Sequence, residues 1–170
     1  MVKRENLAFR KNCEGYFIDD NGMILAQNSG KGYIIFPGGG INRNETPEEG
    51  LLRETFEETG VIIKRKLKKL GVIHIIWGEN WAKTDKQKRR YKKYKGDEMH
   101  FFFCKINKLE KPRGDPENPN EDDVWMRERF IPIARVIEII EKCKPFPKDD
   151  EKYYNAQLKF LKKLMRRTQS

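Results

Sequence analysis

The stretch 39–61 reads GGINRNETPEEGLLRETFEETGV and predicts a glycine-rich turn that leads into a single helix. Thr46 is a favourable N-cap, the proline after it suits the first helical position, and Glu49 completes a T-x-x-E capping box. Gly60 is a natural stop signal, because glycine readily takes the left-handed conformation that ends many helices. We therefore expect a helix over residues 47–59.

Three glutamates of this helix are expected to share one face. Glu54, Glu57 and Glu58 stand at positions i, i+3 and i+4, which at about 100° per residue fall within one narrow arc. Carboxylates at this spacing repel one another and destabilise a helix by about a few tenths of a kcal/mol per pair. Mg²⁺ or Mn²⁺ removes the repulsion, because hard divalent cations bind carboxylate oxygens. Arg53 lies one turn before Glu57 and can pair with it.

The remaining positions predict how this helix packs. Gly50 falls in the arc of the glutamates and is expected to leave open space above it. The glycines at 38–40 let the backbone approach a metal ion or a phosphate closely. An acid-rich surface helix without function is the alternative, but it explains neither these glycines nor the arginine beside the glutamates. The side expected to face a sheet carries Leu52, Thr55, Phe56 and Thr59.

This pattern resembles the sequence box of the Nudix hydrolases, G-x5-E-x7-R-E-U-x-E-E-x-G-U, in which U is a bulky aliphatic residue. Thr55 departs from it, because this core-facing position usually carries an aliphatic side chain, and the departure concerns packing rather than chemistry. The matching positions are Gly39, Glu45, Arg53, Glu54, Glu57, Glu58, Gly60 and Val61.

The resemblance implies a fold and an activity. The fold is a Nudix-type α/β/α sandwich, of the α/β (α+β) class, with a mixed β-sheet between helices. The activity is metal-dependent hydrolysis of a diphosphate bond in a nucleoside diphosphate linked to another moiety. The substrate is left open among a nucleoside triphosphate, a dinucleoside polyphosphate, ADP-ribose and an RNA 5′ end. A homodimer is expected only by analogy with relatives.

The resemblance also implies roles for single residues. Arg53 orients Glu57 through a salt bridge, and Glu45 supports the site. The expected catalytic residues are Glu57, Glu58 and Arg53, and either glutamate or a later acid can be the general base. The expected ligands of Mg²⁺ or Mn²⁺ are the carbonyl of Gly39 and the side chains of Glu54, Glu57, Glu58 and Glu121. For Glu121, which precedes two aspartates, a solvated acidic loop is the alternative.

Apolar periodicity predicts the other elements. Strands are expected over 14–18, 23–27, 33–36, 68–77 and 99–106, with a short strand within 125–132. Further helices are expected over 133–143 and 152–167. Residues 78–97 and 110–123 are expected to be polar connections. We expect a single domain over residues 1–170, with a basic inserted loop at about 78–98.

The segment 81–98, WAKTDKQKRRYKKYKGDE, concentrates positive charge. Lys and Arg occupy eight positions from Lys83 to Lys95, where a single Asp and two tyrosines are interleaved. Basic groups mixed with aromatic rings hold phosphates and stack bases, and a mobile solvated hairpin is the alternative. The residues expected to bind substrate are Glu45, Gly38, Trp77, Trp81, Arg89 and Arg90.

Composition narrows the class of protein. The formal net charge of +10 favours polyanionic partners such as nucleotides or RNA, although a basic surface also aids solubility. No apolar run reaches the ~20 residues of a membrane span, and the first residues lack the apolar core of a signal peptide. A cytoplasmic protein is therefore expected. The three cysteines, Cys13, Cys104 and Cys143, form no C-x-x-C pair, so a disulfide framework or zinc site is not expected.

Two other functions compete with a hydrolase. One is a non-catalytic nucleotide- or RNA-binding module on the same fold, although such proteins usually lose glutamates of the box. The other is an isopentenyl diphosphate isomerase, which shares the fold but uses a catalytic cysteine, and no cysteine is expected near the box.

Overall fold

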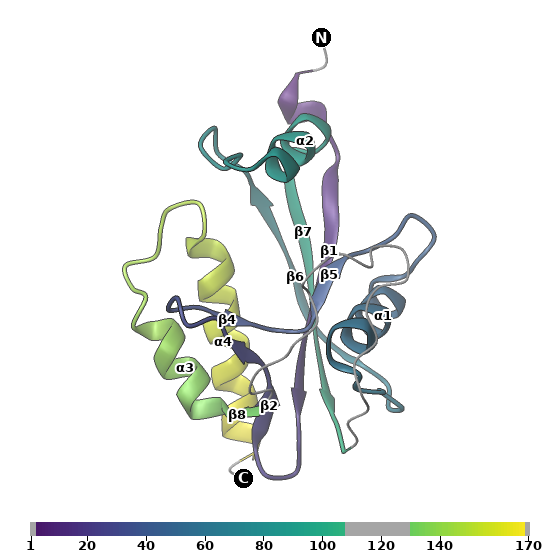
Figure 1. Cartoon of the computed structure of the whole chain (residues 1–170), viewed down its shortest axis with the longest axis vertical. Helices are drawn as coiled ribbons and strands as arrows, with labels where there is room; N and C mark the ends of the chain where they lie inside the picture. Colours follow the sequence, from purple (N-terminus) through teal and green to yellow (C-terminus); the bar gives the residue numbers. More distant parts are fainter. Residues whose placement is uncertain (1–2, 108–129, 169–170) are drawn as a thin grey trace.

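The computed structural model of the chain describes residues 3–107 and 130–168. Its elements, drawn in Figure 1, are η1 (Arg4–Asn6), β1 (Phe9–Ile18), β2 (Met23–Leu25), β3 (Gln27–Asn28), β4 (Ile34–Ile35), β5 (Gly38–Gly40), α1 (Pro47–Thr59), β6 (Lys68–Ile76), α2 (Asp85–Lys93), β7 (Gly96–Lys105), β8 (Phe130–Pro132), α3 (Ile133–Glu141) and α4 (Glu151–Thr168).

The central sheet is mixed. Its strands follow the order β6-β7-β1-β2-β8, and β5 pairs with β1 off this path. β1 runs parallel to β7 over its whole length, from Phe9 beside Gly96 to Ile18 beside Lys105. β5 and β2 are both antiparallel to β1, so the triple glycine is part of the sheet and not a free loop.

Helices cover both faces of the sheet, with α1 on one side and α3 and α4 on the other (Figure 1). Side chains along β1 alternate between the two faces, as the pleat requires. Phe17 packs in the cluster under α1, whereas Tyr16 packs in the cluster beneath α3 and α4. The expected fold, an α/β/α sandwich with a mixed sheet between helices, is confirmed.

Helix α1 begins and ends where the sequence predicted. The side chain of Thr46 accepts a hydrogen bond from the Glu49 amide at 3.2 Å, and the reciprocal bond completes the capping box. Gly60 ends the helix with φ of 70°. Short-range signals therefore fixed both ends of this helix.

The packing of α1 differs from the prediction in two places. Leu51, not Leu52, packs under the helix, because the buried stripe runs at a spacing of four through Leu51, Thr55 and Thr59. Leu52 is 37% exposed. Gly50 is buried instead of leaving open space, since an added Cβ would lie 3.3 Å from a side-chain atom of Ile41.

Thr55 occupies the aliphatic position of the box without leaving its hydroxyl unpaired. The hydroxyl donates to the carbonyl of Leu51 at 2.6 Å, and Thr59 makes the same bond to Thr55. Both side chains are fully buried. A buried polar group is tolerated when it is hydrogen-bonded, which explains why this departure from the box is compatible with the fold.

The polar connection expected over 78–97 joins β6 to β7 but is not a loop throughout. Residues Asp85–Lys93 form α2, and Thr84 with Gln87 makes a complete capping box. The helix carries no buried residue, so its sequence lacks the apolar stripe from which helices are predicted. The strand β7 also begins earlier than expected, at Gly96.

Other boundaries shift by a few residues. β1 begins at Phe9 instead of residue 14, and the expected strand over 23–27 divides into β2 and β3. The expected connection over 110–123 lies outside the described residues. Among the helices that the structure describes, none is long and apolar enough to cross a membrane.

Candidate active site

The glycines of β5 bring the backbone against the glutamates of α1. The amide of Gly38 donates to a carboxylate oxygen of Glu58 at 3.2 Å. A Cβ on Gly39 would lie 2.7 Å from the carboxyl carbon of Glu54. Gly38 has φ of 152°, and a Cβ there would lie 2.1 Å from the carbonyl oxygen of Cys13. Glycine is therefore required at Gly38, where the close atoms are backbone, whereas a side chain at Gly39 would displace the carboxylate of Glu54.

Arg53 organises the carboxylates of the helix. Its guanidinium donates to Glu45 at 2.7 and 3.1 Å, to Glu54 at 2.9 Å and to Glu57 at 3.2 Å. A further bond reaches the carbonyl of Gly40 at 3.1 Å. The hydrogen bond from Arg53 lowers the pKa of Glu45 to about 2, and the bond to Glu45 raises the pKa of Arg53. One planar group thus ties three carboxylates to β5.

The donor groups at this place suit a hard divalent cation. They are carboxylate oxygens and a backbone carbonyl, which Mg²⁺ and Mn²⁺ prefer over sulfur or nitrogen donors. Glu54 already lies against Gly39, and Glu58 against Gly38. Within residues 3–107 and 130–168, no three His, Cys, Asp or Glu side chains are grouped closely enough to hold a metal. The expected ligand Glu121 lies outside the described residues.

A cavity of about 420 Å³ opens on the other side of the glycines. Gly38 and Gly39 form part of its wall, and the same two glycines contact Glu58 and Glu54 of α1, although no residue of α1 lines the cavity. Its volume falls within the ~300–1,000 Å³ that small-molecule sites occupy. The polar and aromatic side chains that line it are Arg10, Asn12, Glu14, Tyr33, Phe36, Trp77, Trp81, Asp97, Asp149, Asp150, Tyr153 and Tyr154.

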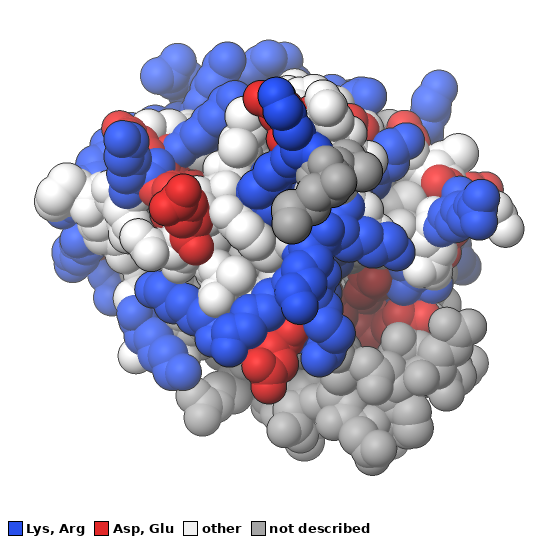
Figure 2. All heavy atoms as spheres, turned by 90° about the horizontal axis from the view of Figure 1, so that it is seen from above, with Lys and Arg blue, Asp and Glu red and all other residues white. Residues whose placement is uncertain are grey.

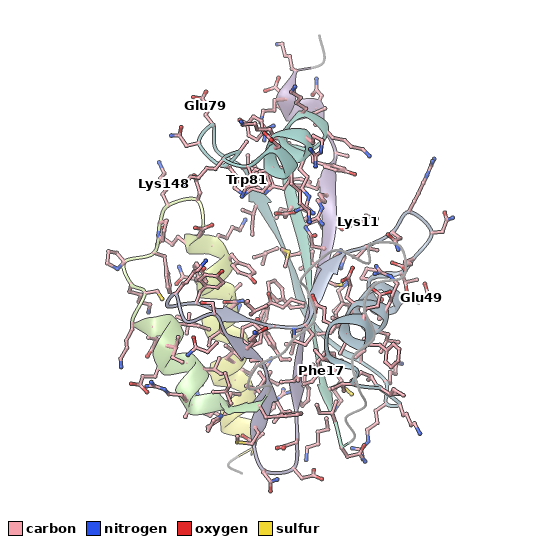
Figure 3. The ribbon with its side chains drawn as sticks, viewed as in Figure 1. Lys11, Phe17, Glu49, Glu79, Trp81 and Lys148 are labelled. Carbon is pink, nitrogen blue, oxygen red and sulfur yellow. The ribbon has the colours of Figure 1, made fainter. Side chains whose placement is uncertain are left out.

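Two tryptophans predicted to bind substrate meet at this cavity. The rings of Trp77 and Trp81 stack with centroids 3.7 Å apart and planes 3° apart. The indole nitrogen of Trp77 donates to Asp97 at 2.8 Å, which fixes the inner ring. Trp77 is 3% exposed and Trp81 is half-buried. Figure 3 shows Trp81 beneath α2, on the side of the α3–α4 connection that carries Lys148.

Arg89 and Arg90, which were predicted to bind substrate, lie on different sides of α2. Neither Arg89 nor Arg90 lines the cavity. Arg90 is half-buried and close enough to help lower the pKa of both Arg10 and Asp97. Arg89 is exposed on the outward side of α2.

Polar residues of β1 and β7 were missed by the sequence analysis. Asn12 contacts both Arg10 and Asp97 through its side-chain amide. Burial raises the pKa of Asp97 and lowers that of Arg10, while their ion pair at 3.7 Å opposes both shifts. The alternation of Arg10, Asn12 and Glu14 was the available signal, because a period of two places all three on one strand face.

A buried glutamate forms the floor of the cavity. Glu14 accepts hydrogen bonds from Tyr16 at 2.8 Å, from Gln157 at 2.9 Å and from Tyr153. Burial raises the pKa of Glu14, and the three donors oppose that rise. This cluster connects β1 to α4, so it fixes one wall of the cavity relative to the sheet.

One cysteine lies beside the box, contrary to the prediction. β1 pairs with β5 so that Cys13 is opposite Gly39, and the thiol contacts the Gly39 carbonyl at 3.5 Å. Burial raises the pKa of Cys13 to about 12. The group therefore stays a thiol at neutral pH, and a thiolate is the reactive form of cysteine. All three cysteines of the chain are free.

Comparison with known proteins shows the family of the chain. A family model described as a NUDIX domain matches residues 13–156. The chain belongs to the Nudix family. An RNA pyrophosphohydrolase from Saccharophagus degradans is 30% identical over 137 residues, which is 76% of this chain and 77% of that protein. An RNA pyrophosphohydrolase from Tolumonas auensis is 35% identical over 82 residues, which is 48% of this chain and 44% of that protein.

A solved structure shows the same Nudix fold. The crystal structure of a MutT protein from Bacillus halodurans superposes with a TM-score of 0.50 at 17% identity, covering 88% of this chain and 82% of that chain. At this identity the likeness concerns the fold alone. The family and the class of enzyme predicted from the sequence, a Nudix pyrophosphohydrolase, are confirmed.

Proposed function

We propose that this Nudix enzyme hydrolyses a diphosphate bond at the 5′ end of RNA in a reaction that requires a divalent metal ion. The observation that carries the proposal is the set of hydrogen bonds by which Arg53 ties three carboxylates to β5, whose glycines line the cavity. RNA is the favoured substrate because the named relatives are RNA pyrophosphohydrolases and because the chain carries a net charge of +10.

The cavity is the proposed place of the terminal nucleoside. The outer ring of Trp81 offers a flat apolar surface, and Asp97 and Asn12 offer groups that accept and donate hydrogen bonds. A nucleobase suits both features, since it stacks on aromatic rings and its polar edges form hydrogen bonds. The phosphates then lie toward Gly38 and Gly39, against which the carboxylates of Glu58 and Glu54 lie.

The glutamates and the Gly39 carbonyl would hold Mg²⁺ or Mn²⁺. Such an ion, when bound, neutralises charge on the phosphates and acidifies water. Arg53 holds Glu54 and Glu57 in place, and Glu45 fixes Arg53 from the far side. The carboxylate of Glu57 or Glu58 takes a proton from the attacking water, a contribution of typically ~10²–10⁴-fold.

The first test is a substrate panel. Cleavage of the diphosphate bond is measured by separating substrate from products, with Mg²⁺ and with Mn²⁺, on triphosphorylated RNA, capped RNA, nucleoside triphosphates, dinucleoside polyphosphates and ADP-ribose. We expect turnover that EDTA abolishes, and the highest kcat/KM on triphosphorylated RNA. If a free nucleotide is cleaved with a higher kcat/KM, that nucleotide and not RNA is the substrate. No cleavage of any member, by protein shown to be folded, would favour a non-catalytic binding module.

Removal of the stacking ring is expected to weaken substrate binding. Base–aromatic stacking contributes about 1–3 kcal/mol per base, so Trp81→Ala should raise KM by roughly 10-fold and affect kcat much less. Trp81→Phe keeps a ring and should recover most of the loss. Steady-state kinetics on the best substrate of the panel measure both. An unchanged KM in Trp81→Ala would mean that the nucleoside does not stack there.

A further inference from the structure

The outward side of α2 is a basic surface near the mouth of the cavity. Lys and Arg fill six of the nine positions of α2, and Asp85 is its single acid. Figure 2 views the molecule from this end and shows Lys and Arg spread over much of the face. The exposed cations of the helix, here called the α2 basic face, are Lys86, Lys88, Arg89, Lys92 and Lys93.

The N-terminal segment holds α2 in place. The guanidinium of Arg4 donates to the carbonyls of Tyr91 at 2.5 Å, Tyr94 at 3.2 Å, Lys95 at 3.1 Å and Trp77 at 3.3 Å. The same group stacks on the ring of Tyr91 at 3.3 Å. Arg4 thereby satisfies carbonyls at the C-terminal end of α2, which lack partners within a helix. The helix is thus anchored from its inner side.

The charges of Arg89, Lys92 and Lys93 within the α2 basic face are hardly compensated. Lys88 pairs with Asp85 at 3.5 Å, an exposed contact that contributes little. Within residues 3–107 and 130–168, no acidic group lies within 4.0 Å of the charged atoms of Arg89, Lys92 or Lys93. Neighbouring like charges repel one another, and a polyanion removes that repulsion. The surface thus matches a chain of phosphates better than a single one.

The α2 basic face is connected to the cavity. Trp81 lines the cavity, and Thr84, which caps α2, follows it by three residues. Arg90 lies on the inner side of the helix, near Arg10 and Asp97 of the cavity wall. A nine-residue helix is about 13 Å long. A nucleotide bound in the cavity with its phosphates at β5 does not occupy this surface, whereas a chain leaving the cavity past Trp81 meets it.

We propose that the α2 basic face binds the phosphate backbone of the RNA that follows the 5′ nucleotide. The enzyme then acts on an RNA chain in preference to a free nucleotide and does so without reading the sequence at these positions. The inference rests on the proposed function of the cavity and the glutamates. Binding through phosphates releases counterions, so the affinity for RNA must fall steeply with salt.

The test compares two triple variants of the full chain. One neutralises the helix with Lys88→Gln, Lys92→Gln and Lys93→Gln. The matched control removes three exposed charges from α4 with Lys159→Gln, Lys163→Gln and Arg166→Gln, so that both variants carry the same net charge. Fluorescence anisotropy gives the Kd of a labelled triphosphorylated RNA oligomer at several salt concentrations. Hydrolysis assays give kcat/KM on the oligomer and on the matching mononucleotide.

We expect the α2 variant to bind the oligomer about 10-fold more weakly and to lower the ratio of oligomer to mononucleotide kcat/KM about as much. Its slope of log Kd against log salt should be smaller by about 2, since each single-strand phosphate contact contributes ~0.7. The α4 control should retain both wild-type values. Equal RNA binding by the α2 variant and the wild type overturns the inference. If RNA binding is equal but only the wild type pellets with phosphatidylserine vesicles, the inference is likewise overturned, and the α2 basic face is a membrane-binding surface.

Failure of the proposed function gives a different result. In that case the wild type hydrolyses neither the oligomer nor the mononucleotide, while the anisotropy experiment still compares RNA binding by the two variants. The α2 basic face and the catalytic assignment are therefore judged by separate measurements.

Discussion

Replacing Glu57 or Glu58 by glutamine is expected to lower kcat by roughly 10²- to 10⁴-fold, the range that general base catalysis contributes. Glutamine has the shape of glutamate but neither its charge nor its basicity. In the wild type the amide of Gly38 donates to the carboxylate of Glu58 at 3.2 Å, and the glutamine of the variant still offers an oxygen to this amide. The helix should therefore keep its place, and melting temperature and circular dichroism should stay near the wild-type values.

Glu48→Gln is the matched control for this prediction. Glu48 lies in the first turn of the same helix and is exposed, so the change removes one carboxylate from α1 away from Gly39. Its kcat should equal that of the wild type. Wild-type turnover in both the Glu57 and the Glu58 variant would exclude the glutamate face as the active site.

The pH profile of the same variants separates the roles of the two glutamates. The acidic limb of kcat against pH reports the group that must be deprotonated in the bound state. The variant that lacks the base should lose this limb, whereas the variant that lacks only a metal ligand should keep it and require more metal for half-maximal activity.

The sequence predicted those parts of the site that depend on neighbouring positions. The ends of α1 follow from Thr46, Glu49 and Gly60, each of which acts within one helical turn. The common face of the three glutamates follows from the helical repeat alone. Arg53 contacts Glu57 for the same reason, because residues four apart are neighbours on a helix surface.

The remainder of the site depends on pairings between distant parts of the chain. Cys13 meets Gly39 only because β5 pairs with β1, and three consecutive glycines give no strand signal. Glu14 meets Gln157 across 143 positions. Such contacts require the register of the sheet and the placement of α4, which no short sequence window contains.

Helix α2 was missed for a different reason. Thr84 and Gln87 form the same kind of capping box that revealed α1. The segment has no apolar stripe, however, because one side faces solvent and the other is held by the hydrogen bonds of Arg4 to carbonyls. Helices are predicted mainly from apolar periodicity, so a helix anchored by polar contacts escapes that criterion.

The second large effect is expected at Arg53. Arg53→Lys should lower kcat by roughly 10- to 100-fold with a smaller change in KM. Lysine keeps the charge, but its three donors share one nitrogen and cannot replace the five hydrogen bonds that the planar guanidinium of Arg53 makes. The reason for the unequal effect is that Arg53 positions the glutamates and does not itself line the cavity. Arg43→Lys, an exposed change before the same helix, should leave both constants unchanged.

The same substitution should change how the stability of the protein depends on pH. Because Arg53 lowers the pKa of Glu45 to about 2, the pair stabilises the fold above the ordinary glutamate pKa of ~4.3 and loses this contribution as the pH falls toward 2. Arg53→Lys weakens the hydrogen bonds, so its melting temperature should differ most from the wild type near neutral pH and converge with it near pH 2. A difference in melting temperature that stays constant across that range, together with wild-type kcat, would show that Arg53 neither lowers the pKa of Glu45 nor positions the glutamates.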